Sequence, residues 1–168
     1  GDMDVLSASY NDDKIAWYEN DGSESFTEHA ISTSADGPRS VYAADVDGDG
    51  DMDVLSASYN DDKIAWYEND GSESFTEHAI STSADGANTV YAIDVDGDGD
   101  MDVLSASKHD DKIAWYENDG SESFTEHAIS TSADYAVSVY AADVDSDGDM
   151  DVLSASILDD KIAWYEQE

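Results

Sequence analysis

The chain has 168 residues, of which 42 are acidic and 6 basic, giving a formal net charge of -36. This charge excludes a nucleic-acid-binding role, because binding phosphates requires a basic surface, and it makes an anionic membrane an equally poor partner. With 40% hydrophobic residues, four Trp and ten Tyr, the chain can nevertheless bury a core, which argues against disorder. Cysteine is absent, so there is neither a disulfide framework nor thiol chemistry.

One acidic stretch recurs along the chain. DVDGDGDMDVLSAS occupies residues 45–58 and 94–107, recurs at 143–156 with one glycine changed to serine, and is preceded by a partial copy at 1–9. Equivalent aspartates lie 49 residues apart (102 − 53 = 151 − 102), so the chain holds about 3.4 repeats (168/49). A period near 50 residues with several short strand signals is typical of a β-propeller blade.

Each period contains four strand-like segments, exemplified by residues 41–46, 54–58, 63–68 and 75–81. Asn-Asp-Gly-Ser follows the third segment and favours a hairpin, while no helical periodicity is present. The pattern predicts an all-β fold of β-propeller-type blades, each with four antiparallel strands. We expect a single repeat domain, 1–168, with blades at approximately 1–36 (partial), 37–85, 86–134 and 135–168 (partial).

The two ends of the chain fall within blades. The chain enters at the second segment of one blade and leaves after the third segment of another, which predicts fourteen strands and three-stranded end blades. Because unpaired strand edges invite association, we expect a homo-oligomer or a part of a longer repeat array.

The recurring acidic stretch has the chemistry of a calcium loop. Alternating aspartates direct several carboxylates toward one centre, and a hard cation prefers such oxygen ligands. Without a cation, two carboxylates about 5 Å apart repel by roughly 3 kcal/mol at an effective dielectric near 20. An EF-hand would require Glu at loop position 12, where this chain has Ser56; here the loop closes at position 9, on Asp53. The alternative, a solvated acidic turn, is disfavoured by three copies at fixed spacing.

The motif D-x-D-x-D-G-x-x-D followed by a strand resembles the FG-GAP/VCBS repeats of integrin α-subunit heads and many bacterial surface proteins. The resemblance implies about three Ca²⁺ sites, with side-chain ligands from the first, second, third and fifth aspartates of each loop and a carbonyl ligand from the fourth. The implied metal residues are Asp45, Asp47, Asp49, Asp51 and Asp53; Asp94, Asp96, Asp98, Asp100 and Asp102; and Asp143, Asp145, Asp147, Asp149 and Asp151. The first loop retains only its closing half, so we expect Asp4 to bind no ion unless another chain supplies carboxylates.

Differences between the copies concentrate in two connections, the turn between the second and third strands and the link from the fourth strand to the next blade. In an up-and-down blade both emerge on the face opposite the calcium loops. We call this set the varied face, and it consists of Tyr10, Asn11, Arg39, Tyr59, Asn60, Asn88, Lys108, His109 and Tyr135. It is a candidate surface for a protein or glycan ligand. The alternative is neutral drift in exposed loops.

Other recurring residues have simpler interpretations. Trp17, Trp66, Trp115 and Trp164 suggest either a ring of sugar platforms or an inter-blade core, and we favour the core. His29, His78 and His127 suggest zinc ligands or hydrogen-bonded strand histidines, and we favour the latter. Paired acids such as Asp12-Asp13 lie in turns beside lysines, whereas glycoside hydrolysis requires carboxylates facing each other across a pocket.

These observations predict a non-enzymatic, calcium-stabilised scaffold for adhesion or ligand binding. The alternatives are a carbohydrate-binding propeller lectin and a self-assembling fibre or surface-layer subunit. We expect no nucleic-acid partner and no membrane insertion, since no apolar run is long enough to span a bilayer. Millimolar external calcium suits such loops and favours an extracellular or cell-surface location. The chain begins mid-repeat without Met, and we expect that a secretion signal lay upstream.

Overall fold

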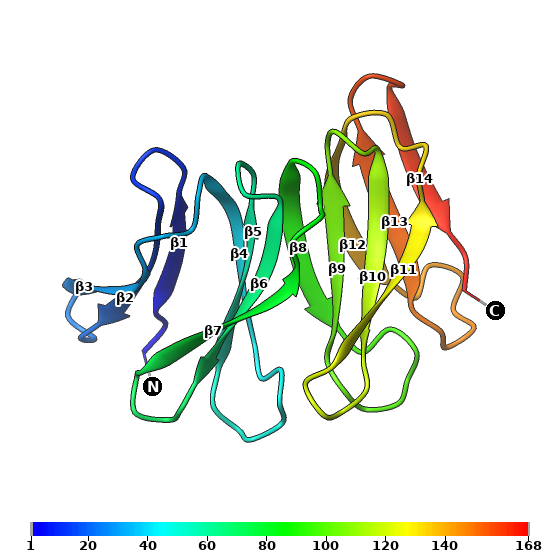
Figure 1. Cartoon of the computed structure of the whole chain (residues 1–168). Helices are drawn as coiled ribbons and strands as arrows, with labels where there is room; N and C mark the ends of the chain where they lie inside the picture. Colours follow the sequence, from blue (N-terminus) through cyan, green and yellow to red (C-terminus); the bar gives the residue numbers. More distant parts are fainter. Residues whose placement is uncertain (1, 168) are drawn as a thin grey trace.

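The structure is a computed structural model, described for residues 2–167. Within this range it contains fourteen strands and no helix, arranged as four antiparallel sheets that stand side by side in an open row (Figure 1). The sheets have three, four, four and three strands, always in chain order from one edge to the other. The predictions of all-β blades, fourteen strands and three-stranded end blades are therefore confirmed, and the row does not close into a ring.

The strands recur with nearly constant bounds. The first sheet comprises β1 (Val5–Ser9), β2 (Lys14–Asn20) and β3 (Phe26–Ser32). The second comprises β4 (Pro38–Ala44), β5 (Asp53–Ser58), β6 (Lys63–Asn69) and β7 (Phe75–Ser81). The third comprises β8 (Ala87–Ile93), β9 (Asp102–Ser107), β10 (Lys112–Asn118) and β11 (Phe124–Ser130). The fourth comprises β12 (Ala136–Ala142), β13 (Asp151–Ser156) and β14 (Lys161–Tyr165).

The first strand of a blade lies earlier in the sequence than its pattern predicts. β4 starts at Pro38, which pairs with Ser58, whereas the sequence pattern places the start of this strand at residue 41. It ends at Ala44, because the Val46 N–H turns out of the sheet and donates to the Asp53 carboxylate at 2.9 Å. Between Pro38 and Ser40 the register shifts by one residue, so Arg39 is the extra residue of a β-bulge. The same shift occurs in β8 and β12.

Each sheet packs one face against the opposite face of the next sheet. Between the second and third sheets, Leu55, Ile64 and Trp66 from one side meet Val103 and Tyr116 from the other in a single buried cluster. Equivalent clusters join the first sheet to the second and the third to the fourth. The core is therefore a series of three similar interfaces, as expected for a stacked repeat architecture.

Tryptophan and histidine lie together across adjacent strands. Trp66 is only 1% exposed, and its indole stacks on the His78 ring with 4.6 Å between ring centroids. His78 Nε2 lies 2.8 Å from Glu68 Oε2. The pairs Trp17–His29 and Trp115–His127 repeat this arrangement. For Trp66 the core interpretation is confirmed, as is the hydrogen-bonded strand histidine for all three copies.

The connections separate onto two faces. In Figure 1 the β4–β5, β8–β9 and β12–β13 loops lie at the lower side of the row, whereas the β1–β2, β5–β6, β9–β10 and β13–β14 turns lie at the upper side. The acidic loops and the varied face are thus on opposite sides of the molecule, as the strand order predicts.

Candidate metal centres

Each acidic loop is shaped by its own aspartates and glycines. In the first complete copy, Asp45 follows directly after β4, and its two carboxylate oxygens accept hydrogen bonds from Gly48 N (2.9 Å) and Gly50 N (3.1 Å). Both glycines have positive φ, 76° and 98°, a region that side chains other than glycine enter only at a cost. The loop therefore curls around the Asp45 side chain and returns the chain to β5 at Asp53.

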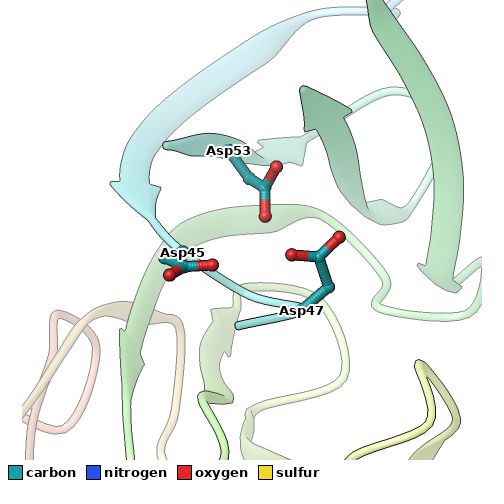
Figure 2. Close-up of side chains that lie close together, drawn as sticks. All are labelled: Asp45, Asp47 and Asp53. Atoms are coloured by element: carbon teal, nitrogen blue, oxygen red, sulfur yellow. The ribbon is translucent and has the colours of Figure 1, made fainter. Parts of the chain in front are cut away.

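The curled loop brings three carboxylates together. Asp45, Asp47 and Asp53 each offer an oxygen, and these atoms lie within 4.8 Å of one another; Figure 2 shows the three side chains directed toward a common centre. Equivalent groups are formed by Asp94, Asp96 and Asp102 and by Asp143, Asp145 and Asp151. Within residues 2–167, these are the groups of at least three potential ligands with this spacing.

Burial makes these carboxylates electrostatically unfavourable on their own. Asp53 is completely buried, and its two oxygens accept hydrogen bonds from Asn69 N (2.8 Å) and Val46 N (2.9 Å). Burial raises the pKa of Asp53, although these hydrogen bonds and the neighbouring Trp66 indole act in the opposite direction. The pKa of Asp47 is also raised, chiefly by burial and further by the negative charges of Asp45 and Asp49. A hydrogen bond from the Asp49 N–H lowers it, but not enough to reverse the shift. A bound cation would remove this penalty.

The donor set fits calcium. All three ligating groups are carboxylates, the hard oxygen ligands that Ca²⁺ prefers, at Ca–O distances of about 2.3–2.6 Å. An ion with bonds of about 2.4 Å holds opposite oxygens about 4.8 Å apart, and the oxygens of each group lie within that limit of one another. The carboxylates present are therefore suited to Ca²⁺ in chemistry and are close enough together to share one ion.

The third and fourth aspartates of the motif lie differently. Asp49, and likewise Asp98 and Asp147, is outside the three-carboxylate group. Asp49 Oδ1 accepts a hydrogen bond from Asp51 N at 2.9 Å and thereby shapes the loop. The Asp51 carboxylate lies beside Gly71 of the neighbouring hairpin, where a Cβ would collide with it. Ligation by Asp49 and by the Asp51 carbonyl stays a prediction, as it does for their equivalents.

The partial first loop contributes no such group. Asp4 Oδ1 accepts a hydrogen bond from Asn20 N at 2.8 Å, the contact that Asp53 makes with Asn69. Within residues 2–167, Asp4 belongs to no cluster of three potential ligands. Whether an ion binds there with help from another chain stays a prediction.

The last acidic loop differs from the other two. Ser146 replaces the first loop glycine and adopts a φ of 68°, and in the described residues Gly148 N donates no hydrogen bond to Asp143. Asp143 and Asp145 are exposed. The pKa of Asp151 is lowered, chiefly by the hydrogen bond from the Val144 N–H, whereas burial raises the pKa of Asp53 and Asp102. This loop is the least enclosed of the three.

Comparison with known proteins supports the assignment. A family model described as FG-GAP-like repeat matches residues 1–56, 45–105 and 94–154. The chain belongs to the FG-GAP-like repeat family. The second and third matches each start at an acidic loop, 49 residues apart (94 − 45), and extend past the next loop, so they follow the period defined by the aspartates. No curated protein matches the chain.

Repeats of the FG-GAP-like family are in general non-enzymatic and are usually found outside the cell. In residues 2–167 the structure holds no helix of the length and apolar character required to cross a membrane.

The varied face forms a connected set of contacts. Tyr10 Oη donates to Asn60 Oδ1 at 3.1 Å, and Tyr59 Oη lies 2.7 Å from His109 Nε2, the same contact one repeat later. Arg39 and Lys108 lie over the neighbouring tyrosine rings, and Arg39 also reaches Asn88. Only Asn11 makes no side-chain hydrogen bond or ring contact within residues 2–167. The structure thus groups eight of the nine residues, while their role in recognition stays a prediction.

One recurring feature escaped the sequence analysis. Tyr42, Tyr91 and Tyr140 lie in a ladder across β4, β8 and β12, with centroid separations of 4.9 and 4.8 Å. The first two line a cavity of about 510 Å³ together with Met52 and Met101. The spacing of 49 residues between these tyrosines was a sufficient signal, because it places them at one position of successive blades.

Proposed function

We propose that the chain is a non-enzymatic, extracellular scaffold in which Ca²⁺ stabilises the acidic loops so that the opposite, varied face can bind a protein or glycan ligand. The observation that carries this proposal is the threefold recurrence of facing, part-buried carboxylates at calcium spacing. Membership of a family whose repeats are generally non-enzymatic and usually extracellular supports it further.

Calcium would act as a structural cofactor. It would offset the repulsion among Asp45, Asp47 and Asp53 and join the end of β4 to the start of β5. Binding to the folded state alone stabilises by about 2.7 kcal/mol per site at a hundredfold excess over the dissociation constant. Because β4 carries Arg39 and β5 leads directly into Tyr59, calcium would maintain the geometry of the varied face as well.

The test is thermal unfolding with millimolar Ca²⁺ and with EDTA, combined with calorimetric measurement of stoichiometry. We expect a large fall in melting temperature in EDTA and about three ions bound per chain. Asp53→Asn should remove one ion. Asp85→Asn is a matched control, because that side chain is exposed and accepts no hydrogen bond within residues 2–167. Equal melting temperatures with and without calcium would refute the proposal.

A second candidate function, assembly with further repeats, is favoured by the two outer faces of the row. Val5 and Phe26 on the first sheet and Ile162 and Trp164 on the fourth are exposed, although their equivalents in inner sheets are covered by a neighbouring sheet. The exposed face of the first sheet is equivalent to one side of each interface between sheets, and the exposed face of the fourth sheet is equivalent to the other side. Further blades, in the same chain or in another copy, would cover them. Sedimentation of the isolated chain tests whether another copy covers these faces. A strict monomer at all concentrations would contradict assembly between copies.

A further inference from the structure

Two positively charged side chains of the varied face, Arg39 and Lys108, lie over the same tyrosine ring, that of Tyr59. Arg39 is the bulge residue of β4, and Lys108 follows β9. A bulge redirects the side chain of the extra residue, and here it places Arg39 toward the turns of the first two sheets. The equivalent bulge residues are Asn88 and Val137, so the positive charge is specific to one repeat.

Tyrosine rings hold both cations in place. The Arg39 guanidinium lies 4.9 Å from the Tyr10 centroid and 4.0 Å from the Tyr59 centroid, so it is placed between two rings. Lys108 Nζ lies 5.6 Å from the Tyr59 centroid and 5.1 Å from that of Tyr135. Such cation–π contacts position a charge without neutralising it.

No carboxylate neutralises these two charges within residues 2–167. The other lysines all do have carboxylate partners at 2.7–2.9 Å: Lys14 with Glu28, Lys63 with Glu77, Lys112 with Glu126 and Lys161 with Asp159. In a chain with 42 acidic residues, a partner for Arg39 or Lys108 would be easy to supply. The two unpaired cations instead share one cluster.

The cost of this arrangement is clearest at Lys108. The residue is only 8% exposed, and its Nζ makes no hydrogen bond within the described residues. Burial, followed by the positive charge of Arg39, lowers the pKa of its ammonium group. An anion between the two cations would offset both effects, since hydrogen bonds to charged groups are about twice as strong as neutral ones.

The surrounding groups define the rest of the ligand. Tyr10, Asn60, Asn88 and His109 belong to the same cluster, where at least one polar atom of each is already hydrogen-bonded, and the remaining hydrogen-bonding capacity of their hydroxyl, amide and imidazole groups is left for a ligand. Such groups, beside aromatic rings, suit the hydroxyls and C–H faces of a sugar. The net charge of -36 opposes a polyanion but has far less effect on a ligand with one negative charge.

Building on the ligand-presenting role proposed above, we propose that Arg39 and Lys108 bind the single carboxylate of an acidic sugar residue, with the neighbouring tyrosine and amide groups contacting its hydroxyls. The site lies on the varied face and draws its residues from the first three sheets and their connections. It is distinct from the calcium loops, which lie on the opposite side of the row (Figure 1).

The experiment is a calorimetric titration of the calcium-loaded chain with glucuronate at low ionic strength. Glucose, which lacks the charge, and acetate, which lacks the sugar, serve as separate probes. We expect glucuronate to bind more tightly than either and its affinity to fall with added salt. Glucose binding as tightly as glucuronate would overturn the role of the cations. Acetate binding as tightly as glucuronate would overturn the role assigned to the sugar hydroxyls.

The variants come from the repeat itself. Arg39→Asn introduces the residue of the equivalent bulge in β8, and Lys108→Tyr introduces the residue of the equivalent turn after β5. Each should weaken glucuronate binding by about tenfold or more, as expected for loss of a charged hydrogen bond. Lys161→Gln removes the same unit of charge elsewhere and should leave the affinity unchanged. Equal affinities in all four proteins would overturn the proposal.

A melting curve of each variant with Ca²⁺ and with EDTA separates this inference from the scaffold proposal. If calcium stabilises every protein and none binds glucuronate, the acidic-sugar site is wrong and the calcium scaffold stands. If calcium stabilises none of them, the scaffold proposal fails regardless of glucuronate binding.

Discussion

The inner and outer sheets have almost the same sequence but very different surroundings. Val54 in the second sheet is 3% exposed, whereas its equivalent Val5 in the first sheet is 49% exposed. Ile64 is completely buried, whereas Ile162 in the fourth sheet is 83% exposed. Because the residues are identical, the difference comes from their surroundings: each outer sheet lacks a neighbouring sheet on one face and lacks one strand that the inner sheets have. Burial in this fold is a property of neighbouring blades rather than of local sequence.

Tryptophan substitution gives the largest test of this comparison. Trp66→Ala in the second sheet should cost about 3–5 kcal/mol, because it removes a fully buried aromatic side chain. Trp164→Ala, at the equivalent site of the fourth sheet, should cost about half as much, because Trp164 is 47% exposed and buries only about half of its surface. Urea unfolding measures both. Similar losses would show that an additional neighbour covers Trp164 in solution.

Carboxylate titration sharpens the comparison at the metal centres. In calcium-free protein, carboxyl ¹³C NMR should place the pKa of Asp53 and Asp102 above the ordinary value of 3.8 and that of Asp151 below it. For the first two, the folded state favours the protonated form. Their contribution to stability is therefore fully present below the unfolded pKa and is lost as pH rises through the folded pKa.

Asp151 has the opposite linkage. Its lowered pKa contributes stability above the unfolded value, and this is lost as pH falls through the folded pKa. With EDTA present, acidification from neutral pH should raise the melting temperature through Asp53 and Asp102. In saturating calcium the same change should not, because protons compete with the ion. If the pKa values of Asp53, Asp102 and Asp151 were all shifted in the same direction, the difference between the two inner acidic loops and the last one would be contradicted.

A smaller effect is expected in the last acidic loop. Ser146→Gly relieves a positive φ and restores the residue found in the two earlier loops, so it should stabilise the calcium-loaded chain by about 0.5–1 kcal/mol. Gly97→Ser, the reverse change in an inner loop, should destabilise by a similar amount. Thermal unfolding compares the two, and a loss of stability in Ser146→Gly would refute this explanation.

The smallest effect concerns surface lysines. Lys63 contacts both Asp61 and Glu77, whereas Lys161 contacts Asp159 alone. Lys63→Gln should therefore destabilise by up to about 1 kcal/mol, and Lys161→Gln by a few tenths, since exposed ion pairs contribute little. Unfolding at low and high salt measures both, and the difference should shrink in salt.

The sequence was sufficient for the strand pattern and the acidic loops, because both depend on local spacing. Alternation in segments such as 63–68 and the Asn-Asp-Gly hairpin determine the strands, and the Asp45–Asp53 spacing determines which carboxylates face each other. The loop position of Asp49 could not be predicted from spacing, because Asp47 and Asp49 share the same alternation and each accepts a hydrogen bond from the N–H two residues on, yet only Asp47 belongs to the three-carboxylate group.

Features that depend on several blades were less accessible. The bulge at Arg39 moved the start of β4 to Pro38, because strand pairing with β5 extends further than the apolar pattern does. The contacts of Arg39 with Tyr10 and Tyr59 join residues of different sheets, and nothing in local sequence specifies them. The tyrosine ladder was predictable only by comparing equivalent positions across the repeats.

The series of three similar interfaces has a consequence for how the molecule unfolds. Each sheet is held only by its immediate neighbours, so its free energy resembles that of one unit in a linear array with nearest-neighbour coupling. The first and fourth sheets have one such coupling each within residues 2–167, and the inner sheets have two. Opening should therefore begin by fraying at both extremities, and amide protons in β5 and β9 should exchange last.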